Sequence, residues 1–350
     1  MSTLAAEIAK QKQASGAGMG VVKGGSKLPH EQLGLTLPQL EAAYRTMLYA
    51  RRFEEKAASL YQQQEIQGFC HLGIGQEAVT TGTKLASLEG DDFITSYRCH
   101  NLALDCGISG LEIMAELTGR AAGISKGKGG SMHMFDPAKR FWGGHGIVGA
   151  QVALGTGLAF ASKYNNEGRV SFTYMGDGAA NAGQVFESMN MAALWKLPVV
   201  FIIENNQWGM GTSVARASAG ELYRRGECFG IVGEKVDGMD LFAVVASVKR
   251  AAAKARAGEP YLLEMDTYRY RGHSMSDPAK YRTREDVENV REARDPINRL
   301  EKYLKEHFKK KPEWFDSLDE TIKADVNEVA AQATTLPYPD EAELWTDVGA

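Results

Sequence analysis

The sequence predicts an α/β fold in which a doubly wound, mostly parallel sheet carries helices on both faces and a helical extension follows at the C-terminal end. Two observations predict it. From about residue 64 to about residue 265, short apolar runs alternate with helical patterns, as expected of successive βαβ units. Beyond Gly272 the only further glycine is Gly349, and the segment 283–309 is charged and has helical spacing.

The first expected element is a long helix that reaches about residue 64. Thr36 and Gln39 resemble a capping box, and apolar residues repeat at helical spacing from Leu40 onward. The expected strands cover 91–97, 170–175, 199–204 and 261–268, and the expected helices lie near 109–118, 150–163, 184–195 and 240–257. Asp295 and Pro296 then stand as the cap and first-turn residues of a new helix.

The domain organisation expected from these elements is simple. Residues 1–35 are glycine-rich and poor in large apolar groups, which is typical of a flexible N-terminal arm. Residues 36–335 should form one α/β domain that includes the C-terminal helices, because no segment inside that range resembles a linker. Residues 336–350 should form a C-terminal tail.

Composition and charge exclude several classes of function. The chain has 40 basic and 44 acidic residues, a net charge of -4, so no basic field exists for nucleic acid or an anionic membrane. The uncharged stretch 141–162 has the length of a membrane span, but its glycines, His145 and Gln151 argue against one. The N-terminal residues lack the apolar core of a signal peptide, which favours a cytoplasmic, bacterial protein.

The unusual feature of the composition is glycine, with 38 residues among 350. The average globular content is about 7%. A surplus in a globular chain indicates places where the backbone turns tightly or approaches a ligand closely, and phosphate groups are frequent ligands of such loops. Many of these glycines fall in the segment 119–149 and on either side of Asp177.

The segment 170–211 carries the clearest chemical signal. It reads as a strand, the sequence Gly176-Asp177-Gly178, a helix, a second strand and then Asn205-Asn206. A βαβ crossover brings the carboxyl ends of both strands to one edge of the sheet, so Asp177 and Asn206 should lie close together. A carboxylate and an amide oxygen suit Mg²⁺, which takes its remaining ligands from phosphate and water. The following helix should direct its N-terminal N–H groups toward the same anion.

A second glycine pattern, residues 144–149, matches G-x-G-x-x-G. We expect no dinucleotide site there, for two reasons. The segment FDPAKRFWG (135–143) precedes it in place of an apolar strand, and no acidic residue ends the next strand about twenty residues later.

The pattern from Gly-Asp-Gly to Asn-Asn resembles the thiamine diphosphate motif. Its surroundings, GDGAANAGQVFESMNMAALWKLP and ENNQWGMGTS, are similar to the α subunits of heterotetrameric, thiamine-diphosphate-dependent 2-oxo acid dehydrogenases of the pyruvate dehydrogenase E1 type. The likeness covers most of residues 40–345. It includes GFCHLGIGQEA (68–78), ITSYRCH (94–100), ELTGRAAGISKGKGGSMHMF (116–135), GGHGIVGAQVALGTG (143–157) and YRYRGHSMSDP (268–278).

The resemblance implies a ligand set for thiamine diphosphate and Mg²⁺. Asp177, Asn206 and the main-chain carbonyl of Trp208 would bind the metal, although the family usually has tyrosine at the position of Trp208. The residues implied for the diphosphate are Tyr97, Arg98, Gly178, Ala179 and His273, and those implied for the pyrimidine and thiazolium rings are Gly146 and Val148. Phe69 and His71 would stand near the reacting carbon, and His71 and His273 are the implied catalytic residues. The basic segment around Arg269 is most often a solvated loop, but in this family it orders over the cofactor.

The resemblance also implies partners. The carboxylate that activates the cofactor comes from an E1 β subunit in this family, so an α₂β₂ heterotetramer is expected, with pyruvate as substrate and the lipoyl domain of an E2 acyltransferase as acceptor. Two alternatives stay open: the α subunit of a branched-chain 2-oxo acid or acetoin dehydrogenase, and a non-catalytic assembly subunit that holds the cofactor.

Overall fold

The computed structural model describes residues 27–348. The chain divides into two compact units, Met1–Thr36 and Leu37–Ala350. In the described part of the first unit, the short helix α2 (Pro29–Gln32) begins where the Leu28 N–H donates to Oε2 of Glu31 at 2.7 Å. The flexible arm expected over 1–35 falls mostly on residues outside the described range, and so does the end of the expected tail.

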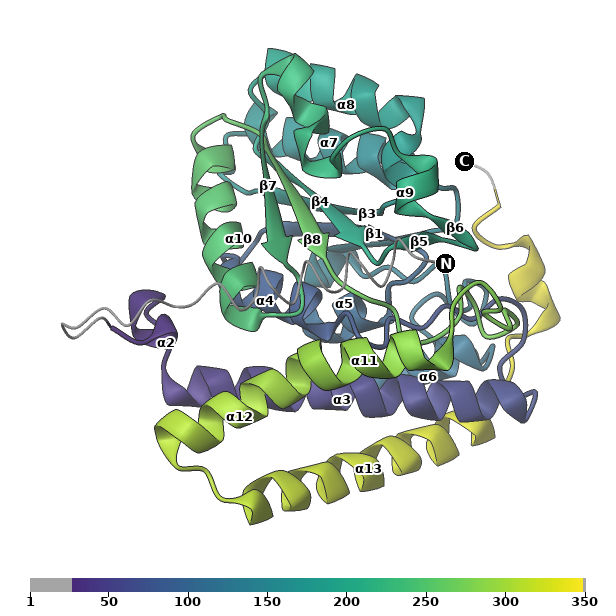
Figure 1. Cartoon of the computed structure of the whole chain (residues 1–350). Helices are drawn as coiled ribbons and strands as arrows, with labels where there is room; N and C mark the ends of the chain where they lie inside the picture. Colours follow the sequence, from purple (N-terminus) through teal and green to yellow (C-terminus); the bar gives the residue numbers. More distant parts are fainter. Residues whose placement is uncertain (1–26, 349–350) are drawn as a thin grey trace. The chain divides into compact units, whose positions relative to one another are not determined.

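The second unit is built on six parallel strands in the spatial order β2-β1-β3-β4-β8-β7 (Figure 1). The strands are β1 (Asp92–Ser96), β2 (Phe141–His145), β3 (Ser171–Gly176), β4 (Val199–Asn205), β7 (Val232–Asp237) and β8 (Tyr261–Asp266). A separate antiparallel pair, β5 (Trp208–Gly209) and β6 (Thr212–Ser213), follows β4. The expected mostly parallel α/β fold is confirmed.

Helices cover both faces of this sheet. Helices α7 (Ala150–Tyr164) and α8 (Gly183–Leu194) pack together on one face, where Val152 and Val185 join Val199 and Phe201 of β4 in one buried cluster. Helices α4 (Glu77–Ala86) and α10 (Leu241–Arg256) pack on the other side, and α10 contacts β4, β7 and β8 (Figure 1). The central strand β4 is buried along its whole length, as a parallel strand covered on both faces requires.

The C-terminal helices pack on the first long helix. Helix α3 (Leu37–Gln62) runs beside α12 (Pro296–Phe308) and α13 (Pro312–Thr335), and α11 (Arg284–Arg294) precedes them (Figure 1). The expected cap of α12 is confirmed, because the Asp295 carboxylate accepts from the N–H groups of Ile297 and Asn298 at 3.0 and 3.1 Å. The remaining elements are α5 (His100–Asp105), α6 (Gly110–Leu117), α9 (Val214–Ala217) and the 3₁₀ turns η1 (Pro137–Lys139), η2 (Ala179–Asn181), η3 (Leu222–Phe229) and η4 (Glu341–Trp345).

Two strands of the six-stranded sheet, β2 and β7, were not expected from the sequence, and neither was the short pair β5 and β6. The edge strand β2 ends at His145, so the glycine pattern 144–149 does follow a strand and does lead into helix α7. The reason based on a missing strand is therefore wrong. The acidic residue that follows the next strand, Asp177, lies 28 positions after Gly149, later than the position about twenty residues on that a dinucleotide site requires, and the exclusion rests on that spacing alone. Both β2 and β7 lie at the edges of the sheet, where strands need no continuous apolar run.

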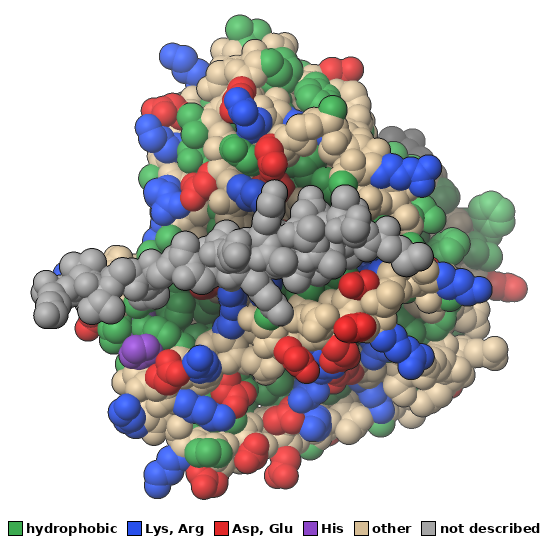
Figure 2. All heavy atoms as spheres, in the orientation of Figure 1, with side chains coloured by type: hydrophobic (Ala, Val, Ile, Leu, Met, Phe, Trp, Pro, Cys, Tyr) green, Lys and Arg blue, Asp and Glu red, His purple; other side chains and the backbone are tan. Residues whose placement is uncertain are grey.

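Charged side chains of both signs are mixed on the visible surface (Figure 2). On the face shown in Figure 2, basic and acidic side chains are interspersed wherever described residues are visible, without a broad region of one sign. None of the helices within residues 27–348 has the length and apolar character needed to cross a membrane. The uncharged stretch 141–162 instead forms β2, a loop and most of α7.

Candidate active site

A cavity of about 250 Å³ opens at the carboxyl edge of the sheet, beyond the ends of β1, β3 and β4. Nine of the twelve residues singled out from the sequence line it: Tyr97, Arg98, Val148, Asp177, Gly178, Ala179, Asn206, Trp208 and His273. The remaining three, Phe69, His71 and Gly146, are not among its lining residues. This edge is where parallel α/β sheets generally bind ligands.

The register of the sheet explains why Asp177 and Asn206 meet there. Strands β3 and β4 are adjacent and parallel, with Gly176 opposite Glu204. The chain leaves β3 at Asp177 and leaves β4 at Asn206, so both side chains emerge at the same edge. The proximity expected from the βαβ unit is thus confirmed.

Asp177 is a buried carboxylate, only 4% exposed, and it forms no ion pair with any residue in the range 27–348. Burial raises the pKa of its carboxyl group from 3.8 to about 6, against smaller lowering effects from backbone N–H groups and from Arg269 and Arg98. A buried negative group without a paired charge is costly unless a cation joins it.

Two further oxygens of the cavity lining accept from the same arginine. The Nη1 atom of Arg269 lies 3.3 Å from Oδ1 of Asn206 and also 3.3 Å from the carbonyl oxygen of Trp208, so both oxygens face this guanidinium group. Within residues 27–348 no group of three His, Cys, Asp or Glu side chains could hold a metal. A cation here would therefore rely on one carboxylate, one amide and one carbonyl oxygen, a donor set that suits Mg²⁺.

The backbone leaves room over Asp177 because glycine occupies both sides of the gap. A Cβ atom added at Gly209 would lie 3.5 Å from the Cα of Gly178 and 3.7 Å from Oδ2 of Asp177. Any side chain at Gly209 would fill the space above the carboxylate, which agrees with the close backbone approach inferred from the glycine surplus.

Two buried arginines, Arg98 and Arg269, line the same cavity, and neither forms an ion pair with any described carboxylate. Arg98 donates from Nη2 to the carbonyl of His273 at 2.9 Å. Burial, together with the neighbouring Arg98, lowers the pKa of Arg269 to about 10. Two guanidinium groups facing a cavity without acidic partners fit a di- or polyanionic ligand.

Two histidines stand together at the side of the cavity. The ring centroids of His71 and Tyr97 are 4.5 Å apart, and those of His71 and His273 are 5.2 Å apart. Burial and the adjacent Arg98 lower the pKa of His71 to about 3 and that of His273 to about 4, so both rings are neutral near pH 7. The Nδ1 atoms of both are buried and have no hydrogen-bond partner within the described chain.

Residues 44–342 match the family model described as "Dehydrogenase E1 component". The chain belongs to this family. It is 56% identical over 308 residues to the pyruvate dehydrogenase E1 component subunit alpha of Rhizobium meliloti (strain 1021). The aligned residues make up 87% of this chain and 88% of that relative. Subunits of the same name are 54% identical in Zymomonas mobilis, with 87% of each chain covered, and 51% identical in Rickettsia bellii, with 87% and 94% covered.

In this E1 component chain, the three expected site residues outside the cavity lining are His71, described above, Phe69 and Gly146. Phe69 is 64% exposed, and its ring centroid lies 6.4 Å from that of His71, so it stands at the surface beside the histidine pair. Gly146 lies against the ring of His133, to which an added Cβ would approach within 3.0 Å. Val148 does line the cavity and is 52% exposed.

The sequence reasoning missed several residues that line the cavity of this E1 component chain. They are Gln76, Ser96, Gly149, Gly176, Glu204, Gly209, Met210 and Arg269. Arg269 is the clearest of these. Its side chain is only 1% exposed, which agrees with the ordered loop that the family resemblance implies and not with the solvated loop that such a basic segment usually forms. Gln76 and Glu204 lie inside sequence blocks that carried the family resemblance, but nothing in the local pattern distinguishes them from ordinary polar residues.

Proposed function

We propose that the chain is the α subunit of a pyruvate dehydrogenase E1 component, which carries out thiamine-diphosphate-dependent oxidative decarboxylation of pyruvate and reductive acetylation of a lipoyl group. The observation that carries the proposal is the cavity itself. It brings together a buried, unpaired carboxylate, two further oxygens that both accept from Arg269, and two arginines without acidic partners in the described chain. That arrangement suits a metal-bound diphosphate, and the names of the relatives agree with it.

In this proposal the chain's own residues bind and orient the cofactor. Asp177, Asn206 and the carbonyl of Trp208 would hold Mg²⁺, and Arg98 with Arg269 would neutralise the diphosphate. The other diphosphate contacts would come from Tyr97, Gly178, Ala179 and His273, and Gly146 and Val148 would lie toward the rings. When bound, thiamine diphosphate supplies a thiazolium ring that acts as the electron sink for loss of CO₂.

The family uses a glutamate of an E1 β subunit to activate the cofactor, and the lining of this cavity is consistent with a site completed by a partner. The carboxylates that this chain contributes to the cavity lining are Asp177 and Glu204. Glu204 lies near the end of β4, opposite Gly176 of β3, and accepts a hydrogen bond from Nε2 of Gln76 at 3.5 Å. A second subunit would therefore bring the activating carboxylate, in an α₂β₂ heterotetramer.

An exposed apolar face on α7 and α8 supports such an assembly. Leu154, Phe160 and Tyr164 of α7 are 45–77% exposed, and Leu194 at the end of α8 is 70% exposed. The Phe160 ring stacks on Tyr164 and lies 5.6 Å from Trp195. An aromatic patch of this kind on a surface usually marks a protein contact.

His71 and His273 would serve acetyl transfer to the lipoyl domain of E2. Both rings are neutral near pH 7, and the Nδ1 atom of each has no hydrogen-bond partner within the described chain. Each ring therefore offers one N–H donor and one acceptor nitrogen to a group that enters the site. Their location beside Phe69, at the exposed side of the cavity, suits contact with an incoming lipoyl arm. A cytoplasmic location stays a prediction from the sequence.

One experiment separates this function from its alternatives. The chain is co-expressed with an E1 β partner, and decarboxylation is assayed with pyruvate and with branched 2-oxo acids while cofactor binding is followed by calorimetry. Preferential turnover of pyruvate supports the proposal, and preference for a branched substrate assigns the chain to the other dehydrogenase type. Cofactor binding in an assembled complex without any turnover would instead identify a non-catalytic holding subunit.

A further inference from the structure

We infer that Gln76 is a positioning residue for the cation end of the cavity: it fixes the amide of Asn206 so that its oxygen, and not its nitrogen, faces the ligand. The inference rests on the proposed function, because it concerns the oxygen that would bind Mg²⁺. The side chain of Gln76 forms hydrogen bonds with Asn206 and Glu204 and, within the described chain, with neither Asp177 nor the carbonyl of Trp208, so its effect on those two ligands would pass through Asn206.

The hydrogen bonds of Asn206 give the amide one orientation. Its Nδ2 donates to Oε1 of Gln76 at 2.9 Å, and its Oδ1 faces Nη1 of Arg269 at 3.3 Å and the N–H of Trp208 at 3.4 Å. The oxygen and nitrogen of an amide have nearly the same size, so packing alone does not choose between them. An acceptor on one side and donors on the other make the choice, and Gln76 supplies the acceptor.

Gln76 itself carries an amide that must be oriented for this purpose. Its Nε2 lies 3.5 Å from Oε1 of Glu204. Burial raises the pKa of the Glu204 carboxyl to about 7, and Arg98 and the hydrogen bond from Gln76 favour the ionised form, which accepts. With Nε2 directed to Glu204, Oε1 of Gln76 is left for Asn206. All three side chains are buried, with exposed fractions of 3% for Gln76, 6% for Glu204 and 7% for Asn206, so water competes little for these bonds.

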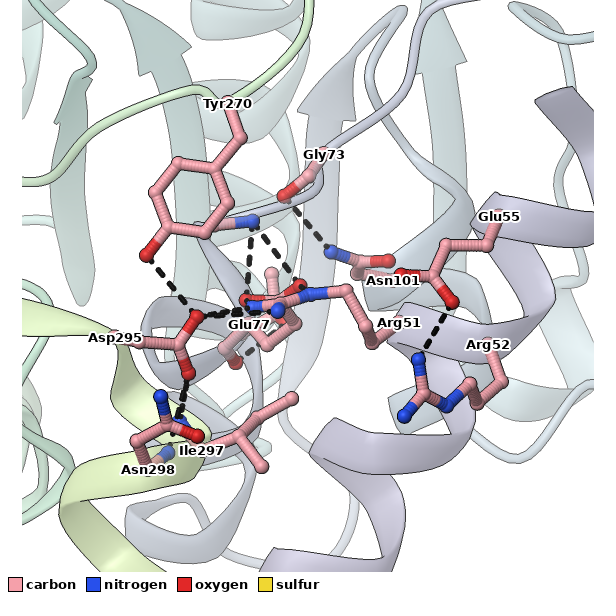
Figure 3. Close-up of polar contacts among 12 residues, drawn as sticks. Arg51, Arg52, Glu55, Gly73, Glu77, Asn101, Tyr270, Asp295, Ile297 and Asn298 are labelled. Atoms are coloured by element: carbon pink, nitrogen blue, oxygen red, sulfur yellow. Dashed lines mark hydrogen bonds and ion pairs between the residues drawn. The ribbon is translucent and has the colours of Figure 1, made fainter. Parts of the chain in front are cut away.

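The turn that carries Gln76 is held by a buried ionic cluster, shown in Figure 3. The Gly75 N–H donates to both carboxylate oxygens of Glu77 at 3.1 Å, and the guanidinium of Arg51 forms a fork with the same carboxylate. Gly75 has a φ of +101°, and an added Cβ would lie 2.4 Å from the carbonyl oxygen of Tyr268. A rigid supporting turn of this kind keeps a second layer of side chains in place before the ligand binds.

A double-mutant cycle tests orientation directly. In Asn206→Asp both terminal atoms are oxygens, so no amide remains to be oriented. In the assembled α₂β₂ complex at fixed thiamine diphosphate, the Mg²⁺ concentration for half-saturation is measured by calorimetry. Gln76→Met should raise it about 10- to 100-fold in the wild-type background and have little effect, under about threefold, in the Asn206→Asp background.

Two comparisons keep the test specific. Thr83→Val removes a buried hydroxyl on the helix that follows Gln76. This hydroxyl donates to the Val79 carbonyl at 2.7 Å and also interacts with the Tyr174 hydroxyl, and neither residue lines the cavity, so the Mg²⁺ requirement should stay unchanged. Gln76→Glu retains an acceptor for Asn206 and should stay closer to wild type than Gln76→Met, which keeps the inference testable if the methionine variant does not assemble.

The outcomes distinguish this inference from the proposed function. Two results would overturn the positioning role and leave the proposed function standing. In one, Gln76→Met raises the Mg²⁺ concentration for half-saturation by the same factor in both backgrounds, and in the other it leaves that concentration unchanged in the wild-type background. A wild-type complex whose thiamine diphosphate binding does not depend on Mg²⁺ would overturn both.

Discussion

Arg51 of α3 and Asp295, the cap of α12, form a buried ion pair with 3.1 Å between Nη1 and Oδ2, although 244 residues separate them (Figure 3). Arg51 also forks onto the fully buried Glu77, and Tyr270 donates to Asp295 at 3.1 Å. The cluster therefore connects α3, the first residue of α4, the loop that carries Tyr270 and the start of α12. Because Gln76 and Arg269 of the cavity lining are the sequence neighbours of Glu77 and Tyr270, the cluster also links the cavity lining to the C-terminal helices.

Removing one charge from this cluster should destabilise the fold. Asp295→Asn keeps a capping side chain for α12 but removes a carboxylate from a buried arginine, and we expect a loss of about 2–3 kcal/mol in the free energy of unfolding, measured with urea. The matched control is Asp319→Asn, which also faces α3 through Arg52 but in a more exposed pair, with a distance of 2.6 Å. Its cost should be at most about 1 kcal/mol, and equal costs for both variants would contradict the role of burial.

The two expectations that succeeded best share a physical cause. The helices and the central strands followed from periodicity and apolar runs, because a buried parallel strand and an amphipathic helix each impose a pattern on consecutive residues. Asp177 and Asn206 were placed together because a parallel crossover fixes where strand ends lie.

The failures have a different cause. Strands β2 and β7 at the sheet edges carry little apolar pattern. Arg269 is held in the cavity by hydrogen bonds that include one to Asn206, 63 positions away in the sequence. The orientation of Asn206 by Gln76 depends on a contact between residues 130 positions apart. Local patterns carry no information on contacts of that kind.

Asp177 should show opposite effects on stability and on function. A carboxyl group whose pKa is raised by folding binds a proton more readily when folded, so its ionised form disfavours the folded chain above about pH 6. Asp177→Asn should therefore stabilise the cofactor-free chain by about 1–2 kcal/mol at pH 7.5, yet abolish Mg²⁺-dependent binding of thiamine diphosphate. Denaturant unfolding and calorimetry check the two parts. The exposed Asp316→Asn is the control, and retained cofactor affinity in Asp177→Asn would refute the assignment.

His71→Ala should slow acetyl transfer more than it weakens cofactor binding. The ring stands beside the cavity and outside its lining, so its loss should leave thiamine diphosphate affinity within about threefold while the rate of reductive acetylation of a lipoyl domain falls about 10- to 100-fold. The two quantities are measured on the same α₂β₂ complex by calorimetry and by lipoyl acetylation. His307→Ala, on α12, serves as the control, and an unchanged acetylation rate in His71→Ala would remove the proposed role.

The histidine pair should make stability depend on pH. Burial, Arg98 and Arg269 lower the pKa of His71 to about 3 and that of His273 to about 4, from an ordinary value of 6.5, and Asp277 opposes this only for His273. Between pH 6.5 and about 4 the unfolded chain thus binds more protons than the folded chain, so stability decreases as pH falls through that range. In His71→Asn, unfolding followed by denaturant should show a shallower decrease over pH 6.5 to 4. A slope equal to that of the wild type would contradict the lowered pKa.

Arg269 should recognise the diphosphate and not the rings of the cofactor. Its guanidinium is buried in the cavity without a carboxylate partner in the described chain, and lysine could not reproduce its fork. Arg269→Met should weaken thiamine diphosphate binding about 10- to 100-fold but leave binding of thiamine, which lacks phosphate, nearly unchanged. Calorimetry with both ligands, each at saturating Mg²⁺, measures the difference. Arg271→Met is a matched control on the same loop because that side chain is exposed. Equal losses for both ligands would show that Arg269 only maintains the shape of the cavity, since a contact specific to phosphate cannot affect a ligand without one.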